Sequence, residues 1–392
     1  MTSDGFCVIL YIEKRINRAE IIIMNKHSRH KQKYIYQHHG YPNFTWDKAL
    51  ILNALTRIAG RQGEILGKMR QFGFGVQHEA MLNALTEEIT KSSEIEGDML
   101  NSEQVRSSLA KRLNIKLETK VPNSHRIDGM VESMMDAVSN HKLPLTKKRL
   151  FGWHAALFPT GYSGIEKIKV AAYRTEEMRV VSTKKYRETV HYEAPPAALV
   201  PSQMSAFLTW LNTDGNVNPL LKAAVAHLWF VIIHPFDDGN GRLTRAVTEM
   251  MLARAENSNL RFYSMSTQIL KERNAYYDIL EQTTTGTLDV TPWLEWFLGC
   301  LERSIENSGE LLRKVTEKAA FWQRNAMEIT DARQREIINR LLDGFTGNLT
   351  SGKAAKILKV SQDTAGRLLK DLAERRFLAI RGAGRSTHYV LN

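Results

Sequence analysis

Apolar residues recur every three or four positions along most of the chain, which is the spacing of one buried face of an α-helix. The pattern is clear over residues 48–58 and 78–96, and helices are expected to continue to about residue 165. It is densest at 220–233, where LLKAAVAHLWFVII is apolar on nearly all sides. A helix that is apolar all round is buried. We therefore predict a mainly α-helical protein built around a central helix at 220–233.

Two segments depart from helical spacing. In residues 179–192, RVVSTKKYRETVHY, β-prone residues flank a polar, lysine-rich tip, which predicts a β-hairpin. Near the C-terminus, helical segments at 350–358 and 362–375 are joined by a short turn and followed by FLAIRGAGRSTHYVL, a second hairpin with glycines at its tip. Two helices and a hairpin in this order are typical of a winged helix-turn-helix domain.

These patterns divide the chain into five parts. A basic tail comes first, and we expect its residues 1–23 to come from an upstream start codon, because Met24 opens a polar sequence that resembles a natural N-terminus. A charged stretch, 311–342, is expected to be one long helix without a dense apolar face. The parts are the tail (1–33), an N-terminal helical module (34–112), a central domain (113–305), a helical connector (306–335) and the winged helix domain (336–392).

The net charge of +12 is concentrated at the two ends of the chain. Residues 1–33 carry +4 and residues 351–392 carry +6, which leaves +2 for the middle. Basic ends favour contacts with nucleic acid, although solvated tails have the same composition. Cys7 and Cys300 have no metal-ligand or redox spacing, which argues against a disulfide framework and a zinc site. No apolar run approaches the roughly 20 residues of a membrane span, so we expect a soluble cytoplasmic protein without a membrane partner.

The run from His234 to Arg245, HPFDDGNGRLTR, places candidate chemistry at the end of the central helix. Pro235 ends that helix and leaves His234 at its tip, which is a rigid position for a general base. Gly239 and Gly241 allow a sharp turn that points backbone amides at an anion, and the start of the following helix adds positive charge in the same direction.

Arg242 and Arg245 lie three residues apart on one face near the start of this second helix. Cations there oppose the helix dipole, so they favour an anionic partner such as the phosphates of a nucleotide. A carboxylate among phosphate-binding groups is favourable only if it holds a divalent cation, which predicts Mg²⁺ at Asp238. Each of these residues alone has an ordinary structural explanation, but their combination in one short run predicts a nucleotide site.

The same run matches H-P-F-x-D-G-N-G-R-x-x-R at every fixed position and therefore resembles the signature of Fic domains. The resemblance implies a helical Fic catalytic domain at 113–305, in which the hairpin at 179–192 is a flap that binds an extended segment of a target protein. It implies that His234 deprotonates a Ser, Thr or Tyr hydroxyl of the target or of the protein itself, which then takes AMP from ATP. It further implies Mg²⁺ at Asp238 and ATP contacts from Gly239, Asn240, Gly241, Arg242, Arg245, Tyr276 and Tyr277. For the two tyrosines, which would contact the adenine, packing in the core is the alternative.

Residues 92–97, SSEIEG, fit the inhibitory pattern of the same family, a Ser or Thr followed four residues later by Glu and then Gly. Ser92 and Glu96 share a helix face and Gly97 ends the helix, so Glu96 can project toward Arg245 and prevent productive ATP binding. The alternative is that Glu96 is an exposed surface charge. An inhibitory glutamate positions water in some relatives, so removal of AMP from a modified protein is a second activity that the resemblance implies.

The C-terminal residues 350–392 predict DNA as a further partner, and a winged helix used only for protein contacts is the alternative. The resemblance also implies a homodimer, which would suit two DNA half-sites. Residues 347–354, GNLTSGKA, nearly spell a phosphate-binding P-loop, but Ala354 lacks the required hydroxyl and no strand precedes it, so we reject that site. The side chains expected to face DNA are Gln362, Asp363, Thr364, Arg367 and Lys370, with Arg381 and Arg385 beside the wing.

Three functions are compatible with this set of residues. The first is an autoinhibited protein adenylyltransferase, and the second is a transcription regulator whose Fic-like domain only senses nucleotide. The third is a metal-dependent phosphohydrolase that uses His234 and Asp238. The intact base and the two arginines favour the first.

Overall fold

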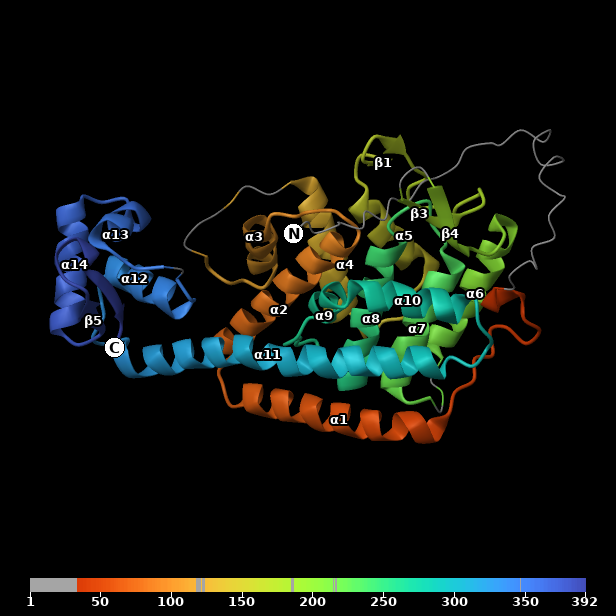
Figure 1. The fold of residues 1–392 in the computed structure, drawn as a ribbon, viewed down its shortest axis with the longest axis horizontal. Coiled ribbons are helices and arrows are strands. Elements are labelled where there is room, and N and C mark those ends of the chain that lie inside the picture. Colours follow the sequence, from red (N-terminus) through yellow and green to blue (C-terminus); the bar gives the residue numbers. More distant parts are fainter. Residues whose placement is uncertain are drawn as a thin grey trace. The chain divides into compact units, whose positions relative to one another are not determined.

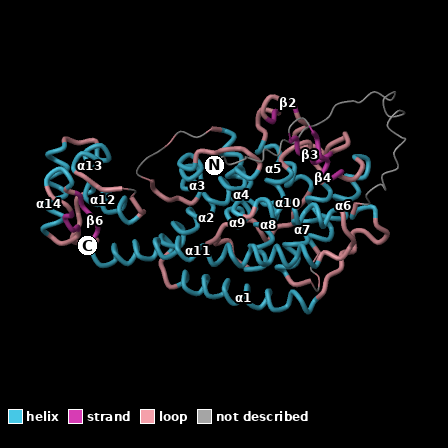
Figure 2. Tube along the Cα trace, in the orientation of Figure 1, coloured by secondary structure: helices cyan, strands magenta, loops and turns pink. Residues whose placement is uncertain are grey.

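The structure is a computed structural model that describes residues 34–117, 121, 124–184, 187–213, 215, 217–345 and 347–392. The expectations for the tail at 1–33 and for the tip of the flap at residues 185 and 186 lie outside the described residues. The chain forms two compact units, whose boundary falls between Ser308 and Gly309 inside helix α11 (Thr291–Asn325). It is mainly α-helical, as the sequence predicts, and the sheets of its described parts have only two strands each (Figures 1 and 2).

The first unit is a set of helices around one apolar core. Several helices begin at polar caps: the Asp47 carboxylate accepts a hydrogen bond from Ala49 N (2.8 Å), and Asn218 Oδ1 accepts one from Leu220 N (2.9 Å). The helices are α1 (Lys48–Arg70), α2 (Phe74–Ile95), α3 (Ser102–Arg112), α4 (His125–Ser139), α5 (Lys147–Leu157), α6 (Val200–Asn212), α7 (Pro219–Ile233), α8 (Asn240–Glu256), α9 (Met265–Lys271), α10 (Arg273–Thr284) and the first part of α11, with 3-10 turns η1 (Ile35–Gln37) and η2 (Ala197–Leu199).

Helix α7 is the centre of this unit, as its apolar sequence predicts. All of its residues except Pro219, Lys222 and Val231 are buried. Helix α8 packs along it, and Trp293 of α11 donates from Nε1 to Ala224 O at 2.9 Å. Figure 1 shows α7 and α8 in the middle of the first unit. The residues that follow α7 are therefore presented from a rigid element.

Two β-hairpins complete the first unit. Strand β1 (Tyr162–Ser163) pairs with β2 (Glu166–Lys167), and β3 (Arg179–Lys184) pairs with β4 (Arg187–Glu193). A register shift between Val180 and Val181 interrupts the second ladder. The Tyr192 hydroxyl donates to Ile232 O of α7 at 2.7 Å. The β3–β4 hairpin, which is the predicted flap, is therefore anchored next to the end of the central helix.

The second unit is a winged helix domain, as predicted. It contains α12 (Ala332–Leu342), α13 (Ser351–Leu358), α14 (Gln362–Glu374) and the strands β5 (Leu378–Arg381) and β6 (His388–Leu391), with a 3-10 turn η3 (Gly384–Ser386) between the strands. These elements enclose an apolar core of their own, in which Ala354, Ala365 and Leu369 are fully buried. None of the helices in the described part of the chain has the length and apolarity that crossing a membrane requires.

The expectation of one continuous helix over 311–342 is wrong. Helix α11 ends at Asn325, and Asp331 starts α12 as an N-cap that accepts a hydrogen bond from Arg333 N at 2.8 Å. Phe321 and Trp322 at the end of α11 pack against the core of the second unit. This stretch therefore has an apolar face. It consists of a few large side chains in a segment whose composition is mostly charged.

Candidate active site

His234 lies at the C-terminus of α7 in a left-handed backbone conformation (φ 48°). This conformation is unfavourable for a residue with a β-carbon, and Pro235 prevents the helix from continuing. Burial, reinforced by the positive charge of Arg174, lowers the pKa of His234 from 6.5 to about 4. The imidazole is therefore neutral near pH 7 and able to accept a proton.

Arg174 fixes the end of α7. This buried side chain donates from Nε to His234 O (2.8 Å) and from Nη2 to Pro195 O (2.5 Å). A cation that binds the last carbonyl groups of a helix is stabilised by the helix dipole. The sequence does not single out Arg174, because it lies in an irregular segment 60 residues before the histidine that it supports.

The Asn240 side chain closes the loop after His234. Its Oδ1 accepts from Phe236 N (2.9 Å) and its Nδ2 donates to Phe236 O (2.8 Å), so in this structure the amide holds the loop. Gly239 has φ 80°, and a β-carbon there would lie 2.8 Å from the Phe158 ring. Glycine is therefore required at this position both for its backbone angle and for space.

A buried histidine, His154 of α5, supports the same loop. Its Nδ1 accepts a hydrogen bond from Ala171 N (3.0 Å), which leaves Nε2–H to donate to Asp238 O (3.2 Å). Burial lowers the pKa of His154 to about 4, so the ring is neutral, as this bonding pattern requires. The ring also stacks on Phe236 at a centroid distance of 4.2 Å. No sequence pattern marks His154 as part of the site.

The Asp238 carboxylate is the candidate Mg²⁺ ligand. Its Oδ1 accepts from Gly239 N (2.5 Å), and its Oδ2 accepts from Ser163 Oγ and lies 3.5 Å from Arg242 Nη2. Within the described ranges, no group of three or more His, Cys, Asp or Glu side chains could hold a metal alone. Mg²⁺ is commonly bound by one or two carboxylates together with substrate phosphates. The donor set fits a shared site of that kind.

The start of α8 faces a carboxylate from α2. Arg245, whose side chain is 1% exposed, donates to Glu96 Oε1 (2.8 Å), Ser92 Oγ (2.7 Å) and Ser92 O (2.7 Å). A β-carbon on Gly241 would overlap with the same Glu96 oxygen, which places this oxygen against the first turn of α8. A negative charge is favourable there.

Burial alone would lower the pKa of Arg245, but the facing Glu96 carboxylate raises it above its ordinary value. The structure thus brings Ser92, Glu96 and Arg245 together, and it does not leave Glu96 as an exposed surface charge.

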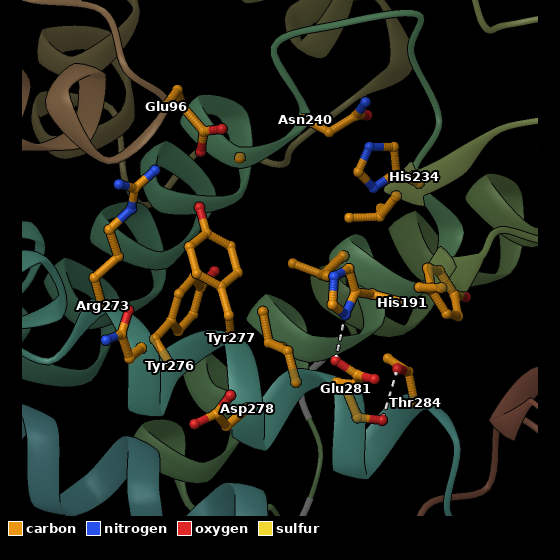
Figure 3. A pocket seen from close by; sticks show the side chains of 16 residues that line it. Glu96, His191, His234, Asn240, Arg273, Tyr276, Tyr277, Asp278, Glu281 and Thr284 are labelled. Carbon is orange, nitrogen blue, oxygen red and sulfur yellow. Dashed lines mark hydrogen bonds and ion pairs between the residues drawn. The ribbon is translucent and has the colours of Figure 1, made fainter. Parts of the chain in front are cut away.

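A cavity of about 340 Å³ opens beside these residues. Glu96 and Arg273 lie on one side of it, and His234 and His191 lie on the other (Figure 3). His191 Nδ1 of the flap is hydrogen-bonded to Glu281 Oε2 of α10 at 2.6 Å. Cavities of this volume accept small organic ligands.

Tyr276 and Tyr277 of α10 line this cavity and are held by different partners. The Tyr276 hydroxyl is hydrogen-bonded to His227 Nε2 at 3.0 Å in the core. The Tyr277 ring lies 5.7 Å from the Arg273 guanidinium, which donates to Ile95 O of α2 at 2.8 Å. The predicted adenine contacts therefore share one cavity with Asn240 and Gly241, whereas the predicted phosphate contacts Gly239, Arg242 and Arg245 do not line it.

Comparison with known proteins is consistent with this geometry. The model of the Fic/DOC family matches residues 144–252, and the model of a domain of unknown function, DUF4172, matches residues 34–115. The protein adenylyltransferase Fic of Drosophila melanogaster is 25% identical over 288 residues, which are 70% of this chain and 54% of that protein. The protein of the same name from Nematostella vectensis is 34% identical over 164 residues, 40% of this chain and 35% of that protein. The chain thus spans about half the length, or less, of these curated relatives.

Among solved structures, a Fic family protein from Desulfovibrio desulfuricans G20 matches with a TM-score of 0.53 and 21% identity. The match covers 90% of this chain and 98% of that chain. At this identity the match shows the fold alone.

Proposed function

Because residues 144–252 are a Fic/DOC family domain, we propose that this chain is a protein adenylyltransferase, which moves AMP from ATP to a Ser, Thr or Tyr hydroxyl of a target protein or of itself. The observation that carries the proposal is the convergence on one cavity of neutral His234, the start of α8 and the tyrosine pair. These supply a base, an anion site and an aromatic surface, which are the parts that nucleotidyl transfer requires.

In the proposed reaction, His234 accepts the proton of the target hydroxyl. The oxygen attacks the α-phosphorus of ATP, the bond from that phosphorus to the oxygen bridging the β-phosphate breaks, and pyrophosphate leaves. His234 then releases its proton to solvent. A base positioned in this way contributes about 10²- to 10⁴-fold to the rate.

The remaining residues of the run bind the phosphates. The backbone at Gly239 and Gly241 directs amides at them, while Arg242 and Arg245 supply the positive charge that stabilises the transition state. When bound, Mg²⁺ at Asp238 neutralises phosphate charge. An extended target segment pairs with the flap by strand addition, which places its hydroxyl near His234.

Autoinhibition is part of the proposal. The Glu96 carboxylate uses donors of Arg245 that the terminal phosphate of ATP would need, and it lies at the helix start where a phosphate would bind. Two anions compete there, so the wild type is expected to transfer AMP slowly. Removal of AMP from a modified protein is the second activity that a glutamate in this position could support.

Labelled ATP with Mg²⁺ tests the proposal. Glu96→Gly should label itself or a protein in a cell lysate far more than the wild type does, and adding His234→Ala should abolish the labelling. Equal labelling of the wild type and Glu96→Gly would contradict the inhibitory role. Release of pyrophosphate supports AMP transfer, whereas release of free AMP without labelled protein would support the phosphohydrolase.

We also propose that the second unit binds double-stranded DNA, because of how its cations are distributed. On α11 and α12, Arg313, Lys318 and Arg340 form ion pairs with Glu317, Asp343 and Glu336. In α14, Lys370 and Arg375 also pair, with Glu374 and Asp371. The helix-turn-helix and the wing further carry exposed cations for which the described residues provide no ion pair: Lys353, Lys356, Lys359, Arg367, Arg376 and Arg381. Uncompensated cations on this fold favour a polyanion.

Fluorescence anisotropy of the full chain with random-sequence duplex DNA tests this second proposal. Binding should weaken steeply as salt rises, and Lys356→Ala should reduce the slope of log K against log salt by about one. Arg340→Ala removes the same charge from a paired position and should change the slope much less. Absence of salt-dependent binding would leave the winged helix with a protein partner. A homodimer, which sedimentation would detect, would present two such domains to two half-sites.

A further inference from the structure

The segment that carries Glu96 also carries a second carboxylate, Asp98. Helix α2 ends in a turn in which Gly97 has φ 80°, Gly97 N donates to Glu94 O (3.0 Å) and Asp98 N donates to Ser93 O (3.0 Å). This pair of hydrogen bonds is the Schellman arrangement, which fixes the backbone at the end of a helix. The turn therefore holds Glu96 and Asp98 on either side of Gly97.

Asp98 lies between two cations. Its Oδ2 is 3.5 Å from Arg242 Nη1 and forms an ion pair with Arg126 of α4. The Arg242 side chain is 9% exposed, and a charge buried to this extent needs a counter-ion. Asp98 provides one and Asp238, also at 3.5 Å, provides another.

Arg242 is neutralised without being saturated by hydrogen bonds. Both carboxylates lie at the outer limit of hydrogen-bonding distance, and Arg242 Nε is buried without a hydrogen-bond partner in the described part of the chain. Arg245 makes three hydrogen bonds to Ser92 and Glu96, and among the described residues only its Nη1 is buried without a partner. A guanidinium in the state of Arg242 retains donors that phosphate oxygens can use.

We infer that Asp98 is an affinity-determining residue, which competes with the phosphates of the nucleotide for Arg242 while Glu96 occupies Arg245. The inference rests on the proposed function, in which ATP occupies the cavity lined by His234 and Gly241 and its phosphates reach Arg242 in the first turn of α8. Asp98 is a weaker competitor than Glu96 for two reasons. Its contact with Arg242 (3.5 Å) is longer than the contact of Glu96 with Arg245 (2.8 Å), and its carboxylate also pairs with Arg126. Since one turn holds both carboxylates, displacement of that turn releases both arginines together.

ATP binding in the presence of Mg²⁺, measured by calorimetry, tests the inference. The parent protein is Glu96→Gly/His234→Ala, in which Arg245 is free of its carboxylate and ATP is not turned over. Adding Asp98→Asn should lower the Kd for ATP about fivefold, as expected for loss of one competing ion pair. Adenosine, which has no phosphate, should bind the two proteins equally.

Glu94→Gln is the matched control. Glu94 lies in the same helix end and loses the same charge, but it pairs with Lys91 at 2.9 Å on the surface. It should leave the Kd for ATP unchanged. An unchanged Kd in Asp98→Asn, an equal fall in Glu94→Gln, or a parallel gain for adenosine would each overturn the inference. Failure of ATP to bind the parent protein would instead count against the proposed function itself.

Discussion

Glu96 Oε1 lies 2.8 Å from Arg245 Nη2, and this ion pair joins the end of α2 to the first turns of α8. Because Arg245 is almost fully buried, loss of the carboxylate removes its facing negative charge and leaves it hydrogen bonds to the neutral Ser92. Leaving one partner of such a pair without the other costs more than the intact pair contributes. The contact that is proposed to inhibit the enzyme is therefore also expected to stabilise the fold.

Glu96→Gly and Glu96→Gln should both be less stable than the wild type, by about 2 kcal/mol in the free energy of unfolding. ATP with Mg²⁺ should restore more stability to these variants than it adds to the wild type, because its phosphates supply the missing counter-charge. Urea denaturation in a His234→Ala background, with and without ATP, measures both effects. Variants as stable as their parent in the absence of ATP would show that Arg245 does not depend on Glu96.

Gly97→Ala should raise AMP transfer to a level between those of the wild type and Glu96→Gly. Gly97 has φ 80°, where a β-carbon costs roughly 1–2 kcal/mol, so the turn that holds Glu96 and Asp98 is expected to relax. Labelling with ATP measures the effect. Gly75→Ala is the control in the same helix, since a β-carbon at Gly75 meets nothing within 4 Å. If the two variants label equally, the turn does not hold the inhibitory carboxylates.

The sequence predicts those residues of the site that follow one another along the chain. His234, Asp238 and the two arginines fall in one run because a helix end, a loop and a helix start follow each other, so local rules place them. Arg174 and His154 support that run from segments 60 and 84 residues away, and only tertiary packing brings them there. A lone arginine or histidine in such a segment carries no periodic signal.

The position of Asp98 could not be predicted from the sequence either, although this residue is only two positions from Glu96. The sequence places Glu96 on the face of Ser92, but the direction of Asp98 depends on a turn that the periodic pattern does not describe. The helical fold was predictable, because apolar spacing persists through α2 and α7. The break between α11 and α12 was not, because Phe321 and Trp322 are too few to form a pattern.

The stability of the first unit should depend on the protonation of His234. Burial lowers its pKa from 6.5 to about 4, so the folded protein keeps it neutral while the unfolded chain takes up a proton below pH 6.5. The stability that the folded protein gains from keeping His234 neutral is therefore fully present above pH 6.5 and is lost as the pH falls toward 4. Between pH 6 and pH 5, the free energy of unfolding of His234→Ala should fall less steeply than that of the wild type, by roughly 1.4 kcal/mol per pH unit.

Urea denaturation followed by tryptophan fluorescence measures this difference, since every tryptophan except Trp322 lies in the first unit. His154 and His227, whose pKa values burial lowers to about 4 and about 3, are present in both proteins and cancel in the comparison. Identical slopes would mean that His234 titrates near its ordinary value in the folded protein.

The packing of α4 on α5 provides a test of how the fold supports the loop between α7 and α8. A β-carbon on Gly129 of α4 would overlap with the carbonyl group of Ala156 in α5, two residues from His154. Gly129→Ala should therefore lower the free energy of unfolding by about 2–3 kcal/mol and displace α5. Gly152 lies in α5 with nothing within 4 Å of its β-position, so Gly152→Ala should raise stability by about 0.5–1 kcal/mol.

Measuring the activity of Gly129→Ala and Gly152→Ala separates an effect on the position of the loop from an effect on stability. In the Glu96→Gly background, Gly129→Ala should lower AMP transfer even at a temperature where it is fully folded, because His154 no longer holds Asp238 O at 3.2 Å. Gly152→Ala should retain the activity of its parent, since it changes no contact of the loop. If Gly129→Ala destabilises the protein but leaves the rate per folded molecule unchanged, the loop keeps its geometry without His154, and His154 is a core residue only.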